Sequence, residues 1–544
     1  MKNETQRTKS KVSKRRRVRR RAINFKSLIV VSIIAFIIYC FVLPPLNICA
    51  PGFWIALFLY FGALGFVNSM TQDGSNRFNT FCAVGAIICI VVLIFGGILC
   101  SEFFNARRYQ RIITVQNGNF NEDITQIEIN QLPILDRDSA EILGDRKMGV
   151  MVDHVSQFEV ANDYTQINIS NRPVRTTPLE YGGGLFKWLN NAKNGVPGYI
   201  NVDMVTQEAE LVRLKQGGMK YVPSAYFGKN LERHLRFRYP TFIFDDYVFE
   251  IDDEGNPWYI VPVVKKTIFM FGGKDIKGAV ILNPITGDST YYDIKDVPQW
   301  VDRVYPVEVV IDQLNWYGTY KNGWWNTKFS KQGMLQCTEG YNYIAKDDDI
   351  WLYTGFTSVG KDESNVGFML VNMRTKEAKY YACPGAEEYS AMKSARGAVT
   401  NYRYEPTFPL LINVNDEPTY LMALKDNASL VKMYALVNVE SYQIVSTGNT
   451  LNEAFINYSK ALMELGRNNG ISAFANATGR VIAVKEAVKA GDTYYYLMLD
   501  GDSNIYVAPI SVSDELPFTS VNDEVFMEYI ESGSEVKQVM NFDK

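Results

Sequence analysis

Residues 278–292 read GAVILNPITGDSTYY, and this pattern decides the fold because it occurs four times in the chain. An apolar run leads into a turn that starts at Asn283 and carries Thr286 and Gly287, and a second run rich in Thr and Tyr follows. This order predicts a strand, a turn and a second strand. The other copies of the pattern occupy residues 198–211, 367–381 and 433–445.

The turn is the most regular part of the pattern. When the copies are aligned on it without a gap, an Asn or Asp is followed three positions later by a hydroxyl residue, in the pairs Asp203 and Thr206, Asn283 and Thr286, Asn372 and Thr375, and Asn438 and Ser441. A short Asn or Asp side chain accepts a hydrogen bond from the backbone two residues on, and a hydroxyl closes the turn from the other side. The repeat therefore has a structural cause, and it names no reaction.

Three of the four copies belong to a longer unit, in which a hairpin precedes the repeated strand pair and a short helix follows it. We expect these helices at residues 297–304, 386–396 and 450–465. The units span residues 241–306, 307–400 and 401–466, after a partial first copy in 147–240. The turn residues are 80, 89 and 66 positions apart, which is too uneven for a strict solenoid and suits separate small domains or a loosely stacked row.

The first 100 residues have the composition of a membrane anchor. Residues 1–26 carry twelve Lys or Arg against one Glu, which is a net charge of +11. The net charge of the whole chain is −3, so residues 27–544 carry a net charge of −14. Residues 27–100 then hold three apolar segments, at 27–46, 52–70 and 81–100. Each segment is near the ~20 residues that cross a bilayer core, so we expect three transmembrane helices in contact with membrane lipid.

The basic tail predicts the orientation of these helices. A basic run can bind nucleic acid or anionic lipid, but the apolar segment directly after residues 1–26 favours a topological role. The positive-inside rule then places the N-terminus in the cytoplasm, and three crossings place residues 101–544 outside the cell membrane. An even number of crossings would instead leave the large C-terminal part in the cytoplasm.

The parts that flank the repeats have compositions of their own. Residues 101–146 are polar and predict a stalk. Residues 467–544 contain five strand-like runs that resemble an OB-fold barrel. That module often holds nucleic acid, but residues 474–544 carry five Lys or Arg against twelve Asp or Glu, and this excess of negative charge would repel a phosphate backbone. We therefore expect the barrel to contact protein.

The repeated turn also resembles a known envelope module. The Asn-Pro-x-Thr-Gly-Asp turn of residues 283–288 is similar to the closing hairpin of PepSY-type domains of bacterial envelope proteins, which commonly end in a Val-Asp-x-x-Thr-Gly-like turn. The likeness covers about fifteen residues per unit, and those domains usually place the helix before the sheet. The resemblance implies a non-catalytic extracytoplasmic module that binds or restrains a partner, sometimes a peptidase.

Three motifs point to ligand chemistry, and each lacks one requirement. Residues 355–361 match a phosphate-binding loop, but Asp362 stands in place of the magnesium-binding hydroxyl and a strand follows where a helix is needed. Residues 500–504, DGDSN, alternate oxygen ligands as a calcium loop does, but no distant Glu follows at the required spacing. His154 and His234 are the two histidines, and they lack the partners of a metal site or a Ser-His-Asp triad. We expect no metal, no nucleotide and no other cofactor.

The densest aromatic run is the candidate for a binding surface. It comprises Trp316, Tyr317, Tyr320, Trp324 and Trp325. Such rings give a carbohydrate or a peptide a large contact area at a small loss of entropy. The alternative is structural, because Trp and Tyr also fill the core between two small repeats.

Together these features predict an α+β protein and leave two functions from different classes. The first is a membrane-anchored extracytoplasmic protein of the bacterial cell envelope that binds or scaffolds another protein and is not an enzyme. The second is an envelope hydrolase or polymer-processing enzyme that uses carboxylates for acid and base catalysis. A deep cleft with paired carboxylates favours the second function, and shallow grooves favour the first. We expect no nucleic acid partner for either.

Overall fold

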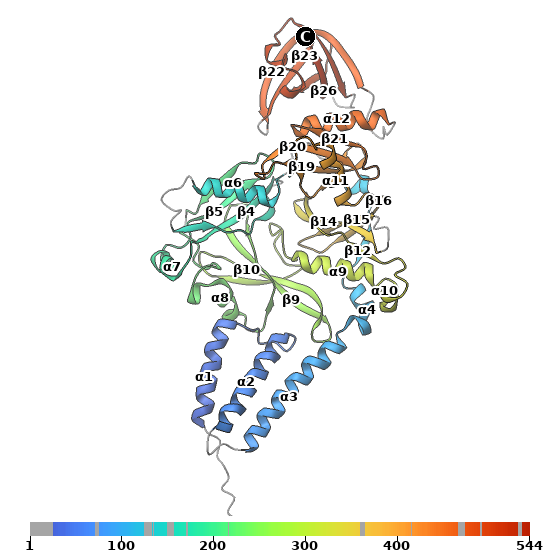
Figure 1. Cartoon of the computed structure of the whole chain (residues 1–544). Coiled ribbons are helices and arrows are strands. Elements are labelled where there is room, and N and C mark those ends of the chain that lie inside the picture. Colours follow the sequence, from blue (N-terminus) through green and yellow to red (C-terminus); the bar gives the residue numbers. More distant parts are fainter. Residues whose placement is uncertain are drawn as a thin grey trace, which may run out of the picture. The chain divides into compact units, whose positions relative to one another are not determined.

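The computed structural model describes the chain at residues 25–70, 76–124, 133, 135–149, 157–169, 172–215, 217–359, 365–414, 416–465, 474–489, 492–530 and 536–544 (Figure 1). The basic tail up to residue 24, His154 and residues 360–362 of the phosphate-loop-like stretch lie outside the described residues. The chain divides into two compact units, one up to Leu99 and one from Cys100 onward. The fold is mixed α and β, as predicted.

The first unit contains the helices α1 (Phe25–Val42), α2 (Pro51–Met70) and α3 (Asn76–Leu99). Within the described residues, two helices, α2 and α3, are long and apolar enough to cross a membrane, one fewer than the three predicted. The apolar stretch of α1, Leu28–Val42, is shorter than the ~20 residues that cross a bilayer core. Pro44 and Pro45 follow α1 and have no backbone N–H with which to continue it, so the end of the apolar run adds no helix length.

Four antiparallel sheets form most of the second unit, and each contains two hairpins in the order that the repeat predicts. The sixteen strands are β3 (Thr165–Ile169), β4 (Arg172–Tyr181), β5 (Gly198–Asp203) and β6 (Ala209–Arg213); β8 (Val248–Ile251), β9 (Pro257–Ile268), β10 (Gly272–Leu282) and β11 (Ser289–Asp293); β13 (Asn342–Lys346), β14 (Asp349–Ser358), β15 (Asn365–Asn372) and β16 (Ala378–Gly385); and β18 (Leu410–Val414), β19 (Glu417–Lys425), β20 (Val431–Asn438) and β21 (Val445–Gly448). The repeated turn joins the third and fourth of these strands in every sheet. The first sheet has all four strands, so the prediction of a partial first copy is wrong.

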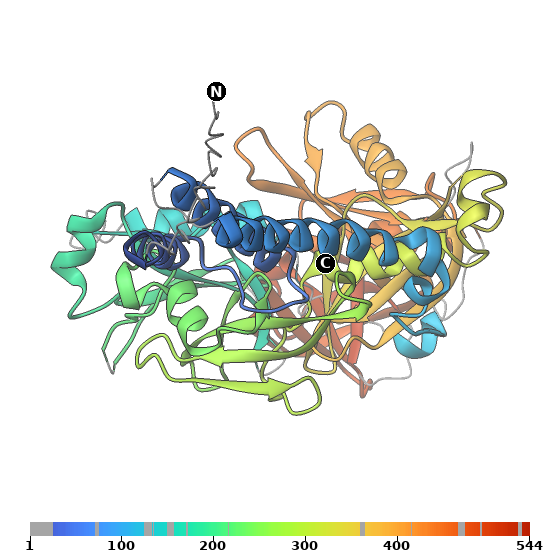
Figure 2. The same ribbon diagram turned by 90° about the horizontal axis from the view of Figure 1, so that it is seen from below.

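Each sheet also has a short strand that no sequence pattern reveals. These strands are β2 (Phe158–Val160), β7 (Ile243–Phe244), β12 (Leu335–Cys337) and β17 (Glu405–Pro406). Each pairs with the C-terminal end of the second main strand of its sheet. For example, β7 pairs with the C-terminal end of β9, and β8 pairs with the N-terminal end of the same strand. Figure 2 shows the long neighbours β9 and β10 side by side. Two or three residues are too few to show a period, which is why these strands were not predicted.

Two of the three predicted helices form. α11 (Glu388–Ala398) and α12 (Leu451–Glu464) confirm the predictions at 386–396 and 450–465. The side chain of Thr450 caps α12, because its hydroxyl accepts a hydrogen bond from the backbone N–H of Glu453 at 3.1 Å. After the first sheet, the corresponding helix is α8 (Leu231–Arg238).

The helix predicted at 297–304 does not form, because its backbone donors bond to distant partners. The N–H groups of Val304 and Tyr305 donate to the carbonyl of Met373 at 3.0 and 2.9 Å, and the N–H of Asp302 donates to the carboxylate of Glu250 at 3.0 Å. N–H groups that donate to these partners cannot also form the hydrogen bonds of an α-helix. The helix of the second repeat instead begins after Pro306, as α9 (Val307–Thr319).

The described residues of the range 101–146 do not form a stalk. α4 (Glu102–Gln110) packs against α9, and β1 (Val115–Asn117) joins the third sheet as a parallel strand beside β16. Farther on, α6 (Arg137–Gly149) packs against β5 and β6. Tyr109 and Ile113 are only 6% and 2% exposed. Single apolar side chains in a polar segment fill gaps between elements here, and composition alone does not reveal them.

The apolar core is continuous between neighbouring sheets. One cluster of buried side chains draws on the first and second sheets, another on the second and third, and another on the third and fourth. Because the sheets share their cores, they form one packed body rather than separate small domains. This outcome resolves the two alternatives that the spacing of the repeats leaves open.

The C-terminal strands close into a barrel, as predicted from five strand-like runs. The strands are β22 (Phe474–Lys489), β23 (Asp492–Leu499), β24 (Ile505–Pro509), β25 (Glu524–Ile530) and β26 (Val536–Asp543). Their order around the barrel is β22-β23-β24-β26-β25, and β24 and β26 run parallel while the other neighbours run antiparallel. Side chains such as Leu497, Tyr506 and Met527 fill the interior.

Candidate functional site

A polar cleft of about 780 Å³ lies where segments of all four repeats converge. Its walls come from the start of α6, from β4, from residues 303–308, which run into the first turn of α9, from residues 341–343 before and within β13, and from the strands β17 and β19 of the fourth sheet. None of these segments is close to all the others in sequence. The cleft is therefore a product of the packing of the repeats rather than of any one repeat.

Arg175 of β4 provides a buried positive charge in this cleft. Its side chain is 7% exposed; Nε donates to the carbonyl of Leu135 at 3.2 Å and Nη2 donates to Oε1 of Gln166 at 3.3 Å. Burial lowers the pKa of Arg175 to about 10, and nearby Asp136 opposes that shift. Within the part of the chain that the structure describes, no carboxylate forms an ion pair with this guanidinium. A buried guanidinium without a carboxylate is unusual, because burial of a charge is costly unless the charge is paired.

Arg303 provides a second guanidinium, on the loop that leads into α9. Nη2 donates to the hydroxyl of Tyr343 at 2.6 Å, and the guanidinium carbon lies 4.6 Å from the centre of the Tyr343 ring. Nε is buried and has no hydrogen-bond partner among the described residues. The charge of Arg303 also contributes to the lowered pKa of Arg175, so the two cations act on each other.

The acidic side chains around the cleft include several that already have structural partners. Asp136 pairs with Lys425, and its Oδ1 accepts from the backbone N–H of Ser139 in the first turn of α6. Glu405 pairs with Arg396. Asp426 accepts from two backbone N–H groups of its own turn, at 2.9 and 3.0 Å. These carboxylates hold the walls of the cleft in place.

Two carboxyl groups are buried against one another behind Arg303. The carboxylate of Glu250 is 0% exposed and accepts from the backbone N–H groups of Asp302 and Arg303, at 3.0 and 2.9 Å. Oδ2 of Asp302 accepts from the backbone N–H of Asn168 at 2.6 Å, while its Oδ1 has no partner among the described residues. Burial raises the pKa of Glu250 to about 7, and burial together with the charge of Glu250 raises the pKa of Asp302. The proton that the pair retains belongs on Oδ1 of Asp302, because both oxygens of Glu250 already accept hydrogen bonds.

The five aromatic residues predicted as a binding surface do not line the cleft, and they occupy three different positions. Trp316 donates to Oε1 of Glu102 at 3.1 Å and Tyr320 donates to Oε2 of the same carboxylate at 2.7 Å, so both fasten α4 to α9. Tyr317 is partly buried against the core of the second and third sheets. Trp324 and Trp325 lie on the short helix α10 (Trp324–Lys328), and their ring centres are 5.0 Å apart.

The other sequence motifs occupy structural positions. Residues 355–358 continue strand β14 rather than forming a phosphate-binding turn. In the loop of residues 500–504, Asp502 accepts hydrogen bonds from Asn504 and Tyr506, which holds the turn together. A ring nitrogen of His234 is 2.8 Å from the carbonyl oxygen of Gly287. Cys337 and Cys383 are free thiols. No group of three His, Cys, Asp or Glu side chains that suits a metal ion occurs in the described residues.

Sequence reasoning missed the cleft and its two arginines. The sequence gives no sign of this position, because β4 reads RPVRTTPLEY, and only its burial in the structure shows that Arg175 is a buried charge. The convergence of Arg175 with Arg303 depends on contacts between repeats, which the sequence does not contain. The comparisons with known proteins add nothing to this point, since no protein-family model matches the chain and no curated protein matches it in sequence.

Proposed function

We propose that the protein is a membrane-anchored, non-enzymatic binding protein of the bacterial cell envelope, and that its cleft receives an acidic segment of a protein partner. The observation that carries this proposal is the pair Arg175 and Arg303, two guanidinium groups without carboxylate partners in a cleft of about 780 Å³. A guanidinium binds a carboxylate through two parallel hydrogen bonds, which adds both affinity and orientation. Arginine and tyrosine side chains are also the residues that contribute most at protein interfaces.

The anchor that we propose consists of α1, α2 and α3. All of α1 spans 18 residues, which is within the range that crosses a bilayer when the flanking residues reach the interface. With the basic tail in the cytoplasm, three crossings place the second unit outside. Two further features fit this location. The repeated turn resembles that of PepSY-type domains of envelope proteins, and the acidic composition of the OB-like barrel suits contact with a protein.

The proposed sidedness has a direct test. Ser503 is exposed in the loop between β23 and β24, whereas neighbouring Asp502 holds that loop together, so Ser503→Cys is the better position for a label. In a variant that also carries Cys337→Ser and Cys383→Ser, the new thiol should react with a membrane-impermeant maleimide on intact cells. Labelling that requires lysis would place the second unit in the cytoplasm.

A hydrolase is the second candidate, and the acidic side chains of the cleft favour it. Asp138, Asp163, Asp246 and Glu308 line the cleft in addition to the three carboxylates with structural partners. Acid and base catalysis would use two of them on opposite sides of a bound substrate. We rank this function second because the two buried charged side chains of the cleft, Arg175 and Lys425, are cations, and a buried cation suits the capture of an anion better than the activation of water.

The binding function is tested by a charge reversal in the cleft. The full chain, purified in detergent and immobilised, should retain an acidic partner from an envelope extract, and Arg303→Glu should abolish that retention. Arg213→Glu, which makes the same charge change at an exposed position of β6, is the matched control and should retain the partner. Equal retention by both variants, with unchanged melting temperatures, would exclude the cleft as the binding site. The hydrolase would be favoured if the wild type released fragments from envelope material and if this release were lost when Asp138, Asp163, Asp246 and Glu308 were replaced by the corresponding amides.

A further inference from the structure

Exposed aromatic side chains gather around α4 and α10 at the start of the second unit. We call Phe103, Phe104, Phe269, Trp325 and Phe329 the aromatic patch, and they are 44%, 63%, 54%, 61% and 78% exposed. The ring centre of Phe103 lies 5.7 Å from that of Trp325, which lies 5.7 Å from that of Phe329. Isolated exposed aromatic residues need no explanation, but exposed rings in contact with one another, as Phe103, Phe104, Trp325 and Phe329 are, mark an interaction site.

Basic side chains border the aromatic patch. The guanidinium of Arg108 lies 5.5 Å from the ring centre of Phe269, and Nζ of Lys328 lies 5.5 Å from that of Trp324. Arg107 is the neighbour of Arg108 on α4 and is exposed. None of these three cations forms an ion pair within the described residues. Rings next to unpaired cations match the layer of a membrane where acyl chains meet phosphate groups.

The patch belongs to a firmly held part of the second unit. Glu102 binds Trp316 and Tyr320 of the α9 region, and Tyr109 donates its hydroxyl to the carbonyl of Cys100 at 2.7 Å. The thiol of Cys100 in turn lies 3.3 Å from the carbonyl oxygen of Ile268, next to Phe269. The aromatic patch therefore cannot withdraw into the core without breaking these contacts.

The sequence identifies what covers this surface. Cys100, Ser101 and Glu102 are the only residues between Leu99, where α3 ends, and Phe103, where the aromatic patch begins. If α3 crosses a bilayer, a chain that leaves it over three residues is still in the interfacial layer. A protein partner has no comparable reason to be at this position.

We propose that the aromatic patch inserts into the interfacial layer of the membrane that α3 crosses, with Arg107, Arg108 and Lys328 on lipid phosphate groups. This inference rests on the membrane anchoring of the proposed function. The consequence is a second attachment to the bilayer, which fixes the orientation of the sheets and the cleft instead of leaving them on a flexible tether. The predicted aromatic binding surface then has a lipid ligand at Trp325 and a structural role at Trp316 and Tyr320.

Tryptophan fluorescence tests the proposal. The full chain is reconstituted in vesicles of phosphatidylcholine and phosphatidylglycerol, with or without bromine on the acyl carbons nearest the headgroup. Brominated lipid should quench the wild type more than a variant with Trp324→Phe and Trp325→Phe. Trp351→Phe is the matched control, since Trp351 is 5% exposed in β14, and it should leave the quenched part of the emission unchanged.

The same experiment separates failure of the patch from failure of the anchor. Trp54 lies in α2, so brominated lipid should quench it in every variant if the first unit is in the membrane. Quenching that is the same in the wild type and in the Trp324 and Trp325 double variant would overturn the lipid contact and leave the anchor intact. Absence of quenching in all variants would overturn both.

The role of the cations has its own test. Arg107→Glu with Arg108→Glu should reduce the quenching assigned to Trp324 and Trp325, whereas Arg213→Glu should not. Equal quenching in these two variants would overturn the role of the cations.

Discussion

The turns of the second and third repeats share one local design and differ in their surroundings. Oδ1 of Asn283 accepts from the backbone N–H groups two and three residues on, at 2.9 and 3.1 Å. Oδ1 of Asn372 accepts from the same two positions, at 2.9 and 2.8 Å. In both turns the threonine hydroxyl accepts from the backbone N–H two residues farther on. The turn chemistry that the sequence predicts is thus present in each.

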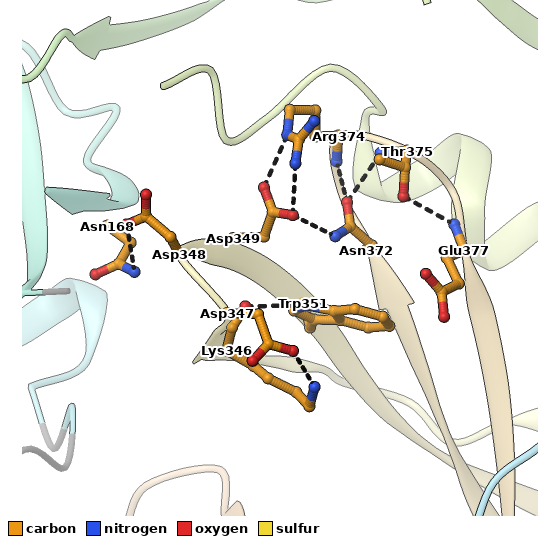
Figure 3. A network of polar contacts seen from close by, with 10 residues as sticks. All are labelled: Asn168, Lys346, Asp347, Asp348, Asp349, Trp351, Asn372, Arg374, Thr375 and Glu377. Atoms are coloured by element: carbon orange, nitrogen blue, oxygen red, sulfur yellow. Dashed lines mark hydrogen bonds and ion pairs between the residues drawn. The ribbon is translucent and has the colours of Figure 1, made fainter. Parts of the chain in front are cut away.

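A charge network ties the third-repeat turn to the neighbouring strand (Figure 3). Nδ2 of Asn372 donates to Asp349 at 2.8 Å, and Arg374 binds both oxygens of the same carboxylate, at 2.8 and 2.7 Å. Asp349 is the first residue of β14. In the second repeat the corresponding strand, β9, begins with Pro257, and no side chain in the described part of the chain accepts from Nδ2 of Asn283.

The first and fourth repeats show which rule underlies the difference. Arg172 begins β4 and pairs with Asp203 of the first-repeat turn, and Glu417 begins β19 and accepts from Asn438 of the fourth-repeat turn at 3.0 Å. In these repeats, as in the third, the first residue of one strand satisfies the turn of its neighbour. A base stands opposite Asp and an acid stands opposite Asn. The turn is a local motif in the second repeat and part of a network between strands in the other three.

The largest effect that we expect concerns the buried carboxyl pair of Glu250 and Asp302. This pair lies next to the third-repeat network, because the charges of Asp349 and Asp348 contribute to the raised pKa of Asp302. Glu250 has its pKa raised to about 7 in the folded protein. A carboxyl group of this kind stabilises the fold below its unfolded pKa, and that contribution is lost as the pH rises through about 7. Glu250→Gln has no such ionisation, so its stability relative to wild type should rise by roughly 3 kcal/mol between ~pH 4.5 and ~pH 8.

Urea unfolding of the full chain at several pH values measures this difference. The lost acceptor of Glu250 sets a constant offset between the two curves, and the ionisation of Glu250, together with its effect on the pKa of Asp302, sets their divergence with pH. Glu254→Gln, in the exposed turn of the same hairpin, is the control and should run parallel to wild type. Parallel curves for Glu250→Gln as well would show that Glu250 is ionised throughout, and the buried pair would then need a different account.

Removal of Asp349 should have the next largest effect and would break the comparison between the two turns. Asp349→Ala leaves Arg374 without its carboxylate and Asn372 without its acceptor. Because the Arg374 side chain keeps 20% of its exposure, the loss should be about 2 to 3 kcal/mol, somewhat below that for a fully buried pair. The double variant with Arg374→Ala should be less destabilised than Asp349→Ala alone, since it removes the unpaired charge. Additive losses would mean that the ion pair contributes nothing beyond its separate parts.

The same contrast explains how far the sequence predicts this fold. Alternation of apolar residues and the Asn, Thr and Gly of the turns predict fourteen of the sixteen main strands, all but β3 and β4, because both signals act within about ten residues. The segment at 297–304 has a helical pattern but does not form a helix, because its backbone N–H groups donate to Glu250 and Met373, which lie far away in sequence. Arg175 and Arg303 meet only after the repeats pack. Local rules therefore predict the elements, and contacts between repeats decide the cleft.

Asn372→Ala tests the network from the side of the turn. The variant loses two backbone hydrogen bonds and the bond from Nδ2 to Asp349, all in a buried environment where Asn372 is 3% exposed. We expect a loss of about 2 kcal/mol, because each buried group left without a partner costs more than the mean value of a hydrogen bond. Asn372→Asp separates the parts: it keeps the backbone bonds but places a second carboxylate beside Asp349. A loss equal to that of Asn372→Ala or larger is expected, and wild-type stability would contradict the network.

Asn283→Ala should have the smallest effect, and it completes the comparison. This variant loses the same two backbone hydrogen bonds as Asn372→Ala but no bond to a neighbouring strand, and the turn is partly open to water, which can replace the lost acceptor. The expected loss is therefore about 1 kcal/mol, read as a shift of the urea midpoint at constant slope. Because the local bonds are the same in the two turns, the excess loss in Asn372→Ala measures the contribution of Asp349 together with the burial of the third-repeat turn. Equal losses would mean that the backbone bonds carry the stability of both turns, and that the charge network of the third repeat, although buried, adds nothing to it.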